Sequence, residues 1–412
     1  MTKMVRFELK KIFSKPVNKI AFIILAVVLC VVSFSSVNSV HYVDENGETK
    51  TGISAARALK ETKMQWSGYI TEDILSKVVI ENTIISNSEE YLSNDVREIN
   101  KAYAKMQGFD DIRNMINRAF CGFRQYDYYR IDSISEKEVR SLYERRTANL
   151  IEWLNSDEAV NHFSEEEKQF LTEQYNKLET PLYYKYFDGW EALLQYTPEI
   201  IMLLVLITGF LVSGIFSDEI RLKADSIFFS TRLGRTRAVS AKIGAGFITI
   251  SAIYWIIILL YSGIVLTALG FEGADCAIQI GSSNWKSFYN ITYFQEYLLT
   301  IFGGYIGSLF ILTFSMLVSA KTRSSVLAVT IPFILLFIPS FLSGTSVFVL
   351  TKMLGLFPDQ LLQMRTTVQL FNTYQIGKKV VGAVPIIFVA YLFLYCVLVP
   401  ILYRVYKKTE VK

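Results

Sequence analysis

The chain has 412 residues, and the distribution of its charges excludes a single soluble globular domain. Only 19% of the residues are charged, whereas ordinary soluble domains carry roughly a quarter. Residues 41–195 nevertheless hold 19 Lys and Arg against 28 Asp and Glu, so the remainder of the chain is depleted in charge. An acidic polar block that interrupts an apolar frame indicates a membrane protein.

Residues 1–19 predict an amphipathic helix on the cytoplasmic surface of the membrane. Val5, Leu9, Ile12 and Phe13 recur at helical spacing, and basic residues occupy the opposite face. A helix of this kind lies among anionic headgroups, so membrane lipid is an expected partner. The alternative is that this segment extends the first membrane span into the cytoplasm.

Six apolar stretches are long enough to cross a bilayer, which takes roughly 20 helical residues. They cover residues 20–40, 199–217, 243–269, 297–320, 325–342 and 384–403. A cleaved signal peptide is the alternative for the first stretch, but five further apolar stretches favour a retained span. Residues 196–412 therefore hold spans two to six.

The positions of Lys and Arg predict a multi-pass protein of the cell membrane with both termini in the cytoplasm. Short basic loops stay on the cytoplasmic side, and residues 1–19 and 218–242 carry six basic residues each. The acidic block 41–195 then lies outside. The segment 343–383 carries four basic residues on the wrong side, and this suggests a re-entrant or interfacial segment around residues 347–362.

The block 41–195 is predicted to form an α-helical extracytoplasmic domain. Ser135 with Glu138, and Ser164 with Glu167, fit the capping box that begins a helix. A longer helix is predicted over residues 71–106, and no useful length of alternating strand pattern is present. The expected fold is an all-α integral membrane protein with six transmembrane helices. Cys121 and Cys276 both fall outside, and whether they pair stays open.

The sequence lacks the motifs by which a chain performs chemistry of its own. It has no GxxxxGK[ST] phosphate loop, no HExxH zinc motif and no GxSxG nucleophile turn. It contains only two histidines. We therefore expect no catalytic, cofactor-binding or metal-binding residues in this chain, no enzyme activity and no nucleic-acid partner. A membrane device that is powered from elsewhere fits this pattern.

Two groups of residues are candidates for substrate contact. The tyrosine cluster of the outer block, Tyr126, Tyr128 and Tyr129, is suited to contact a peptide or a lipid. Glu199 and Glu296 lie near the predicted outer ends of the second and fourth spans, where acidic residues are functional suspects. Both are expected to be interfacial first and substrate-facing second.

The segment 218–242 has an acidic start, an apolar middle and a basic end. A short helix of this composition is suited to docking in a groove of another protein. The residues expected at this contact are Glu219, Ile227, Phe228, Phe229, Arg232, Arg235 and Arg237.

This segment also resembles the permease subunits of type-2 ABC transporters. The matching positions are Glu219, Ser230, Thr231, Gly234, Arg235 and Lys242. Arg232 departs from the family pattern, which often has proline there. The resemblance covers the spans and the N-terminal helix, and the outer block would be a large domain inserted between the first and second spans.

The resemblance implies a pathway formed by two permeases, identical or related. It also implies two separate ATPase subunits, which would bind ATP and Mg and push on 218–242 as a coupling helix. The substrate would be a peptide, a lipid or a drug-like molecule, with antimicrobial-peptide export or immunity as one branch. The alternative is a non-transporting membrane sensor or scaffold whose outer domain binds a peptide or protein. An integral membrane enzyme is disfavoured, because no polar residues cluster at one membrane depth.

Overall fold

The computed structural model describes every residue except 1, 222–235, 343–347 and 409–412. Six of the described helices are long and apolar enough to cross a membrane. They are α2 (Pro16–Asn38), α9 (Asp188–Arg221), α11 (Arg237–Leu269), α12 (Tyr293–Thr322), α13 (Ser325–Leu342) and α17 (Ala383–Lys407). The prediction of six apolar helices of membrane length is confirmed, and the chain is a mostly helical membrane protein.

Helices α9 and α12 form the centre of the bundle, and the other membrane-length helices surround them. In their most apolar windows α9 and α12 are 72% and 67% buried, against 22%, 22% and 17% for α2, α13 and α17. The peripheral helices instead expose large apolar side chains, such as Phe34 (71%) and Phe393 (66%). Exposed apolar surface of this extent is stable against lipid chains and not against water.

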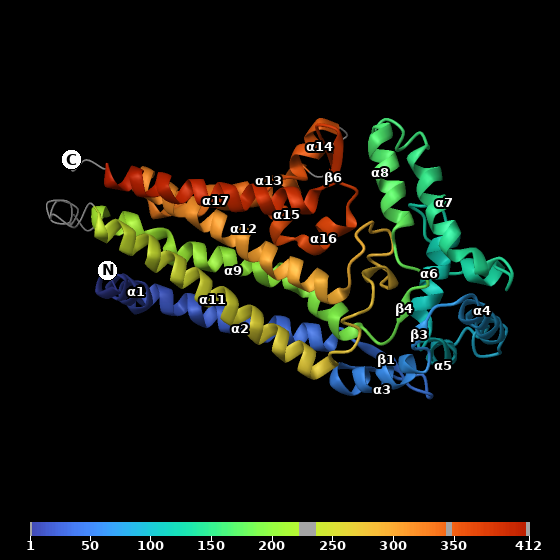
Figure 1. Ribbon diagram of the computed structural model, residues 1–412. Helices are drawn as coiled ribbons and strands as arrows, with labels where there is room; N and C mark the ends of the chain where they lie inside the picture. The colour runs from blue at the N-terminus through green and yellow to red at the C-terminus, as the bar shows by residue number, and fades with distance from the viewer. Residues whose placement is uncertain (1, 222–235, 343–347, 409–412) are drawn as a thin grey trace.

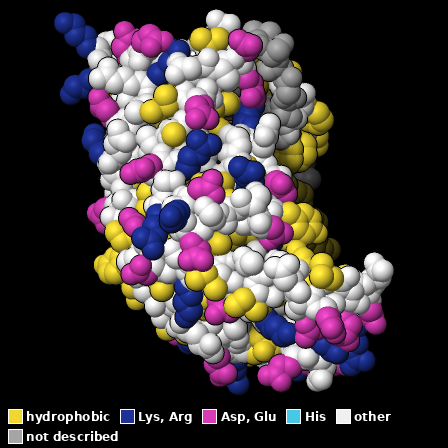
Figure 2. All heavy atoms as spheres, turned by 90° about the vertical axis from the view of Figure 1, so that its right-hand side faces the viewer, with side chains coloured by type: hydrophobic (Ala, Val, Ile, Leu, Met, Phe, Trp, Pro, Cys, Tyr) yellow, Lys and Arg dark blue, Asp and Glu magenta, His cyan; other side chains and the backbone are white. Residues whose placement is uncertain are grey.

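Both described ends of the chain lie at one end of the bundle, called here the terminal end (Figure 1). The segment between α2 and α9, with the segments after α11 and α13, lies at the opposite, distal end (Figure 1). The surface of the distal end carries intermixed basic and acidic side chains (Figure 2). The bundle therefore separates two regions of different composition.

Short helices make up most of the distal region. Those between α2 and α9 are α3 (Gly52–Met64), α4 (Glu72–Ser86), α5 (Val96–Met106), α6 (Asp110–Phe120), α7 (Leu142–Leu154) and α8 (Glu165–Asn176). Single 3₁₀ turns cover Arg130–Ser133, Val139–Ser141 and Ile278–Ile280. Three more helices follow α13, namely α14 (Phe348–Leu354), α15 (Asp359–Leu362) and α16 (Met364–Gln369). Helices α14 and α15 fall in the segment that was expected to be re-entrant or interfacial, and α16 follows it.

The described residues also form three small antiparallel strand pairs that the sequence did not predict. The strands are β1 (His41–Val43) with β2 (Thr49–Thr51), β3 (Gly68–Tyr69) with β4 (Tyr183–Tyr184), and β5 (Thr373–Ile376) with β6 (Lys379–Gly382). Strands of two to four residues are too short to show an alternating pattern. They fasten loops together and add no sheet layer to the helical fold.

The helix predicted over residues 71–106 is wrong in its length, because the chain breaks at 87–95 into α4 and α5. Asp95 caps the second of these helices by accepting a hydrogen bond from the Arg97 amide. The Ser164–Glu167 capping box forms at the start of α8 as predicted. The Ser135–Glu138 bonds also form, but a 3₁₀ turn follows them, and α7 begins only at Leu142.

The N-terminal residues form a separate helix, α1 (Thr2–Ser14), and do not extend the first span. Lys15 is extended, with φ −67° and ψ 129°, because the proline that follows it disfavours helical geometry. Helix α1 packs against α11 and also contacts α2 and α9. Ile12 on its apolar face is buried. The amphipathic helix predicted from the sequence is thus present and lies across the terminal end of the bundle.

The distal region is joined to the bundle by packing and by a buried ion cluster. One continuous core of buried apolar side chains includes both distal residues such as Leu75 and span residues such as Leu312. Lys63 of α3 contacts Asp188, the first residue of α9, at 2.8 Å, and Asp111 of α6 at 2.7 Å. Burial lowers the pKa of Lys63, but the two carboxylates outweigh this effect and raise it above its usual value.

All four cysteines are free, and Cys121 and Cys276 are both buried without forming a disulfide.

Candidate functional site

The end of α9 and the start of α11 meet in a buried ion pair at the terminal end of the bundle. Glu219 lies in the last turn of α9, and Lys242 lies in the second turn of α11. The Lys242 Nζ donates to Glu219 Oε1 at 2.6 Å and to the Ile215 carbonyl at 2.8 Å. Lys242 is fully buried, and Glu219 is 7% exposed. This pair therefore closes the base of the segment that the sequence predicts as a docking helix.

Helix α1 adds further charges to the same cluster. Lys11 donates to Glu219 Oε1 at 2.6 Å, and Glu8 accepts from Lys242 at 3.3 Å. Lys15 pairs with Asp218, the neighbour of Glu219. Burial lowers the pKa of Lys11, but Glu219 and then Glu8 outweigh it and raise that pKa above its usual value. Three helices that are distant in sequence are thus held by one network of opposite charges.

Removing any one charge from this network is expected to cost free energy. Taking a charge out of water costs several kcal/mol, and the cost is recovered only when the partners and hydrogen bonds are in place. Removing one buried partner leaves the other charge uncompensated, which typically costs about 3–5 kcal/mol. The Glu219–Lys242 geometry consequently fixes the spacing of the two helix ends.

Of the residues predicted to contact an ATPase, the structure describes two. Glu219 is a member of the buried network, so its carboxylate faces the protein interior. Arg237 is exposed at the first position of α11. The other predicted contact residues, Ile227, Phe228, Phe229, Arg232 and Arg235, lie outside the described residues.

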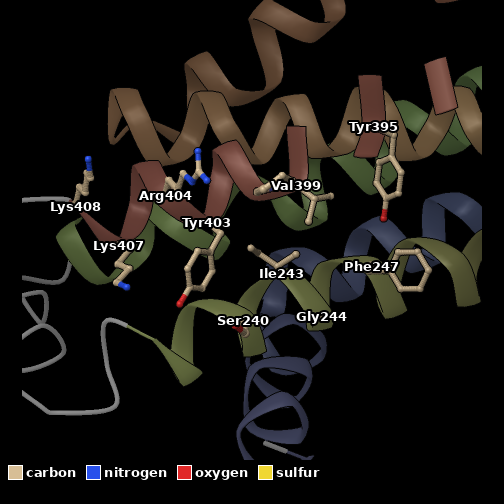
Figure 3. Close-up of a pocket in the computed structure, with 11 residues that line it drawn as sticks. Ser240, Ile243, Gly244, Phe247, Tyr395, Val399, Tyr403, Arg404, Lys407 and Lys408 are labelled. Carbon is tan, nitrogen blue, oxygen red and sulfur yellow. The ribbon is translucent and has the colours of Figure 1, made fainter. Parts of the chain in front are cut away.

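A cleft of about 900 Å³ lies beside this network, between α11 and α17. Tyr395 and Tyr403 reach from α17 toward α11, where Ser240, Gly244 and Phe247 lie (Figure 3). Arg404, Lys407 and Lys408 line the cleft at the terminal end, and the Lys407 side chain points to the α11 side of α17 (Figure 3). The cleft combines apolar walls with cations, a combination that accommodates the acyl chain and headgroup of an anionic lipid.

The predicted substrate-contact residues do not come together in one cavity. Glu199 lines a polar cavity of about 310 Å³ at the distal end, with Glu191, Gln195 and Arg365 among the other lining residues. Glu296 does not line this cavity. It is fully buried in the first turn of α12, where it accepts hydrogen bonds from the Asn284 amide at 3.2 and 3.3 Å. It therefore lies near the end of a membrane-length helix, as expected, but its side chain is enclosed by protein and does not face water.

The tyrosine cluster lies on the distal surface and lines neither of these two cavities. Tyr128 is held in place, since the Arg113 guanidinium lies 4.0 Å from its ring centroid and donates to its carbonyl at 2.9 Å. Tyr129 is 60% exposed and meets the Tyr128 ring edge-on. Tyr126 is partly exposed and donates to Asn114. Contacts within the protein therefore hold these three side chains in place on the distal surface.

Glu8, Lys11 and Arg365 belong to charge clusters that the sequence did not predict. Residues 1–19 contain six basic residues and a single acidic one, Glu8. This lone carboxylate was the sequence signal for an ion pair. Arg365 pairs with Glu191 of α9, and Lys352 pairs with Glu167 of α8. These pairs explain how Lys352 and Arg365 are accommodated in 343–383, a segment that the sequence predicts on the non-cytoplasmic side. Carboxylates of the distal region neutralise their charge.

Within the described part of the chain, no group of three or more His, Cys, Asp or Glu side chains is placed to hold a metal ion. Comparison of the sequence with protein-family models and with curated proteins gave no match.

Proposed function

We propose that this chain is the membrane subunit of a transporter whose energy comes from a separate ATPase, as in type-2 ABC systems. The observation that carries the proposal is the buried Glu219–Lys242 pair. It ties together the two helix ends between which the predicted docking segment runs. A displacement applied to that segment would pass to α9 and α11 as a unit. Separating the pair would leave a buried charge without its partner, which costs free energy.

Helix α9 is suited to carry such a displacement to the other end of the molecule. It is 34 residues long and therefore spans roughly 50 Å at 1.5 Å per residue. Its first residue, Asp188, is held by the buried Lys63, and its last turn is held by the buried Lys242. Both ends of one central helix are thus fixed to neighbouring elements by ion pairs.

In this proposal the ATPase binds at the terminal end, which faces the cytoplasm. The distal region lies outside and contacts a peptide, lipid or drug-like substrate. A second permease, identical or related, completes the pathway, and the exposed apolar faces of α2, α13 and α17 offer surface for it or for lipid. The cleft of α11 and α17 holds an anionic lipid.

Photo-cross-linking in the native membrane tests the proposal. Two variants of the full chain, with the native cysteines replaced, carry a benzophenone maleimide at Arg237→Cys or at Lys379→Cys. Arg237 is an exposed residue of the docking segment, and Lys379 is exposed at the distal β5–β6 turn. We expect a P-loop ATPase, identified by mass spectrometry, to be cross-linked from position 237 and not from position 379.

Two outcomes would count against the proposal. An ATPase captured equally from both positions would show no preference for the terminal end. Capture of only a kinase or of no protein at position 237, from membranes in which complexes stay intact, would favour a sensor or scaffold.

A further inference from the structure

An aromatic cavity of about 470 Å³ lies at the distal end, away from the charge network and the cleft described above. Four rings among its lining residues come from separate parts of the chain: Phe123, Trp153, Phe163 and Phe371. The Phe123 and Trp153 rings are stacked with their centroids 4.8 Å apart. Phe371 lies 5.6 Å and Phe163 also 5.6 Å from Trp153. Such a set of rings provides flat apolar walls for another ring.

Cations surround these rings. The Arg124 guanidinium lies 5.2 Å from the Trp153 ring centroid, the Lys286 ammonium 5.2 Å from that of Phe123, and the Lys352 ammonium 5.8 Å from that of Phe163. The lining contains one carboxylate, Glu158, which pairs with Arg124. Lys352 pairs with Glu167 at 2.5 Å. Two of the three cations are therefore already matched by acidic groups.

Lys286 is the cation without such a match. Among the described residues, no carboxylate lies within 4 Å of its Nζ. Burial lowers its pKa below the usual value, and the neighbouring Arg118 and Arg124 lower it further, which the more weakly acting Glu158 only partly offsets. A half-buried ammonium in this environment is stabilised by an anion that enters the cavity.

Trp153 supplies a second polar group without a partner. It lines the cavity and is only 8% exposed. Its indole Nε1 is buried and has no hydrogen-bond partner among the described residues. A buried donor that is left unpaired costs about 1–3 kcal/mol, so an acceptor brought in by a ligand recovers that free energy.

We propose that this cavity binds an aromatic carboxylate. The ring of the ligand would pack among the four aromatic side chains, and its carboxylate would accept from the Lys286 ammonium and the Trp153 indole. One unmatched cation and one free donor suit a singly charged group with two acceptor oxygens. The volume falls in the range of small-ligand sites, so the ligand is either a small free acid or the C-terminal residue of a peptide. The site does not rest on the proposed energy coupling, because its lining residues belong to the distal region and not to the terminal end.

Binding to the purified full chain in lipid nanodiscs, measured by calorimetry, tests this assignment. The probes are 3-phenylpropionate and a short peptide that ends in phenylalanine with a free carboxylate, and each is compared with its neutral amide. We expect both acids to bind saturably and both amides to bind at least about tenfold more weakly, because charge-assisted bonds are lost. Tighter binding of the peptide acid identifies a peptide ligand, and tighter binding of phenylpropionate identifies a small acid.

Variants of Lys286 locate the binding. Lys286→Met is expected to weaken the acids about tenfold, whereas Lys286→Arg retains most of the affinity. The matched control is Lys77→Met, since Lys77 also places its ammonium over a ring, that of Trp66 at 4.6 Å, without lining the cavity. Thermal unfolding of each variant shows whether it is folded, and the arginine variant keeps the test valid if the methionine variant is not.

The proposal is wrong if neither acid binds, if the amides bind as tightly as the acids, or if Lys286→Met and Lys77→Met behave alike. The titration contains no ATPase and no nucleotide. Its failure therefore leaves the proposed energy coupling unaffected, and failure of the cross-linking experiment leaves this site unaffected.

Discussion

At the scale of single residues, Lys242 is a charged side chain with no exposed surface at the terminal end of the molecule. Its ammonium is fully buried and is surrounded by Glu219, Glu8 and the Ile215 carbonyl. A buried ion pair adds little to stability compared with apolar residues of the same shape. Its value lies in specificity, since any arrangement that separates these groups leaves a charge in an apolar environment.

We predict that Lys242→Met lowers the free energy of unfolding by about 3–5 kcal/mol, because Glu219 and Glu8 lose their buried partner. Adding Glu219→Gln to this variant should cost less than the sum of the two single changes, since the pair acts as a unit. Thermal unfolding in detergent measures both effects. Lys321→Met, at an exposed lysine in the last turn of α12, is the control. Equal losses of stability at positions 242 and 321 would show that the network does not contribute to the free energy of unfolding.

Part of this network was accessible from the sequence, and part was not. Glu219 was singled out as a docking residue and Lys242 through the family resemblance, but their pairing was not predicted. Lys11 and Glu8 were not singled out, because a contact between residues 208 positions apart leaves no periodic pattern. The same reason hides the aromatic cavity, whose lining comes from positions as far apart as 123 and 372.

At the scale of elements, close helix contacts depend on glycines that leave room for a neighbour. A Cβ added at Gly304 of α12 would lie 2.5 Å from the Ile201 Cδ1 of α9 and 2.6 Å from the Tyr254 hydroxyl of α11. Helices α9, α11 and α12 meet at this position. Gly303 and Gly307 face α15 and α16 instead, where Leu361 and Leu362 approach them. Their four-residue spacing therefore serves packing within this chain.

We predict that Gly304→Ala destabilises the protein by about 1–3 kcal/mol, because the added methyl group overfills the contact. Gly263→Ala on α11 should instead be neutral or stabilising by up to about 1 kcal/mol, since no atom lies within 4 Å of the added Cβ and alanine favours the helix. Thermal unfolding of the two variants compares the same chemical change at a filled and an open position. A stabilised Gly304→Ala variant would contradict the tight crossing.

The elements themselves were predictable to different degrees. Long apolar helices follow directly from hydropathy, and the structure retains all six. The distal elements depend on local breaks, such as the one at 87–95, where no glycine or proline marks the end of the helix. Strands of two to four residues form because tertiary contacts align their loops.

At the scale of the whole molecule, the two ends of the bundle have different roles in the charge balance. The terminal end concentrates basic residues, which the positive-inside rule assigns to the cytoplasm. The distal end contains Lys352 and Arg365, but Glu167 and Glu191 neutralise them. Two of the four basic residues of 343–383 are thus paired with carboxylates, and the orientation with both termini inside stays a prediction.

Labelling of single cysteines tests this orientation. In a background without native cysteines, Tyr129→Cys at the distal end and Lys408→Cys at the terminal end both place an exposed thiol in water. We expect a membrane-impermeant maleimide to label position 129 on intact cells and position 408 only after permeabilisation. Labelling in the reverse order would show the opposite orientation. Labelling of both positions on intact cells would contradict the predicted topology.

The N-terminal helix also has a consequence for how the protein is made. Helix α1 leaves the ribosome well before its partner Glu219, which follows Lys11 by 208 residues. At a synthesis rate of about 5–20 residues per second, this delay is roughly 10 to 40 seconds. During that interval Glu8, Lys11 and Lys15 lack their partners on α9 and α11. Docking of α1 is consequently a late assembly step, completed only after α9 and α11 are in the bilayer.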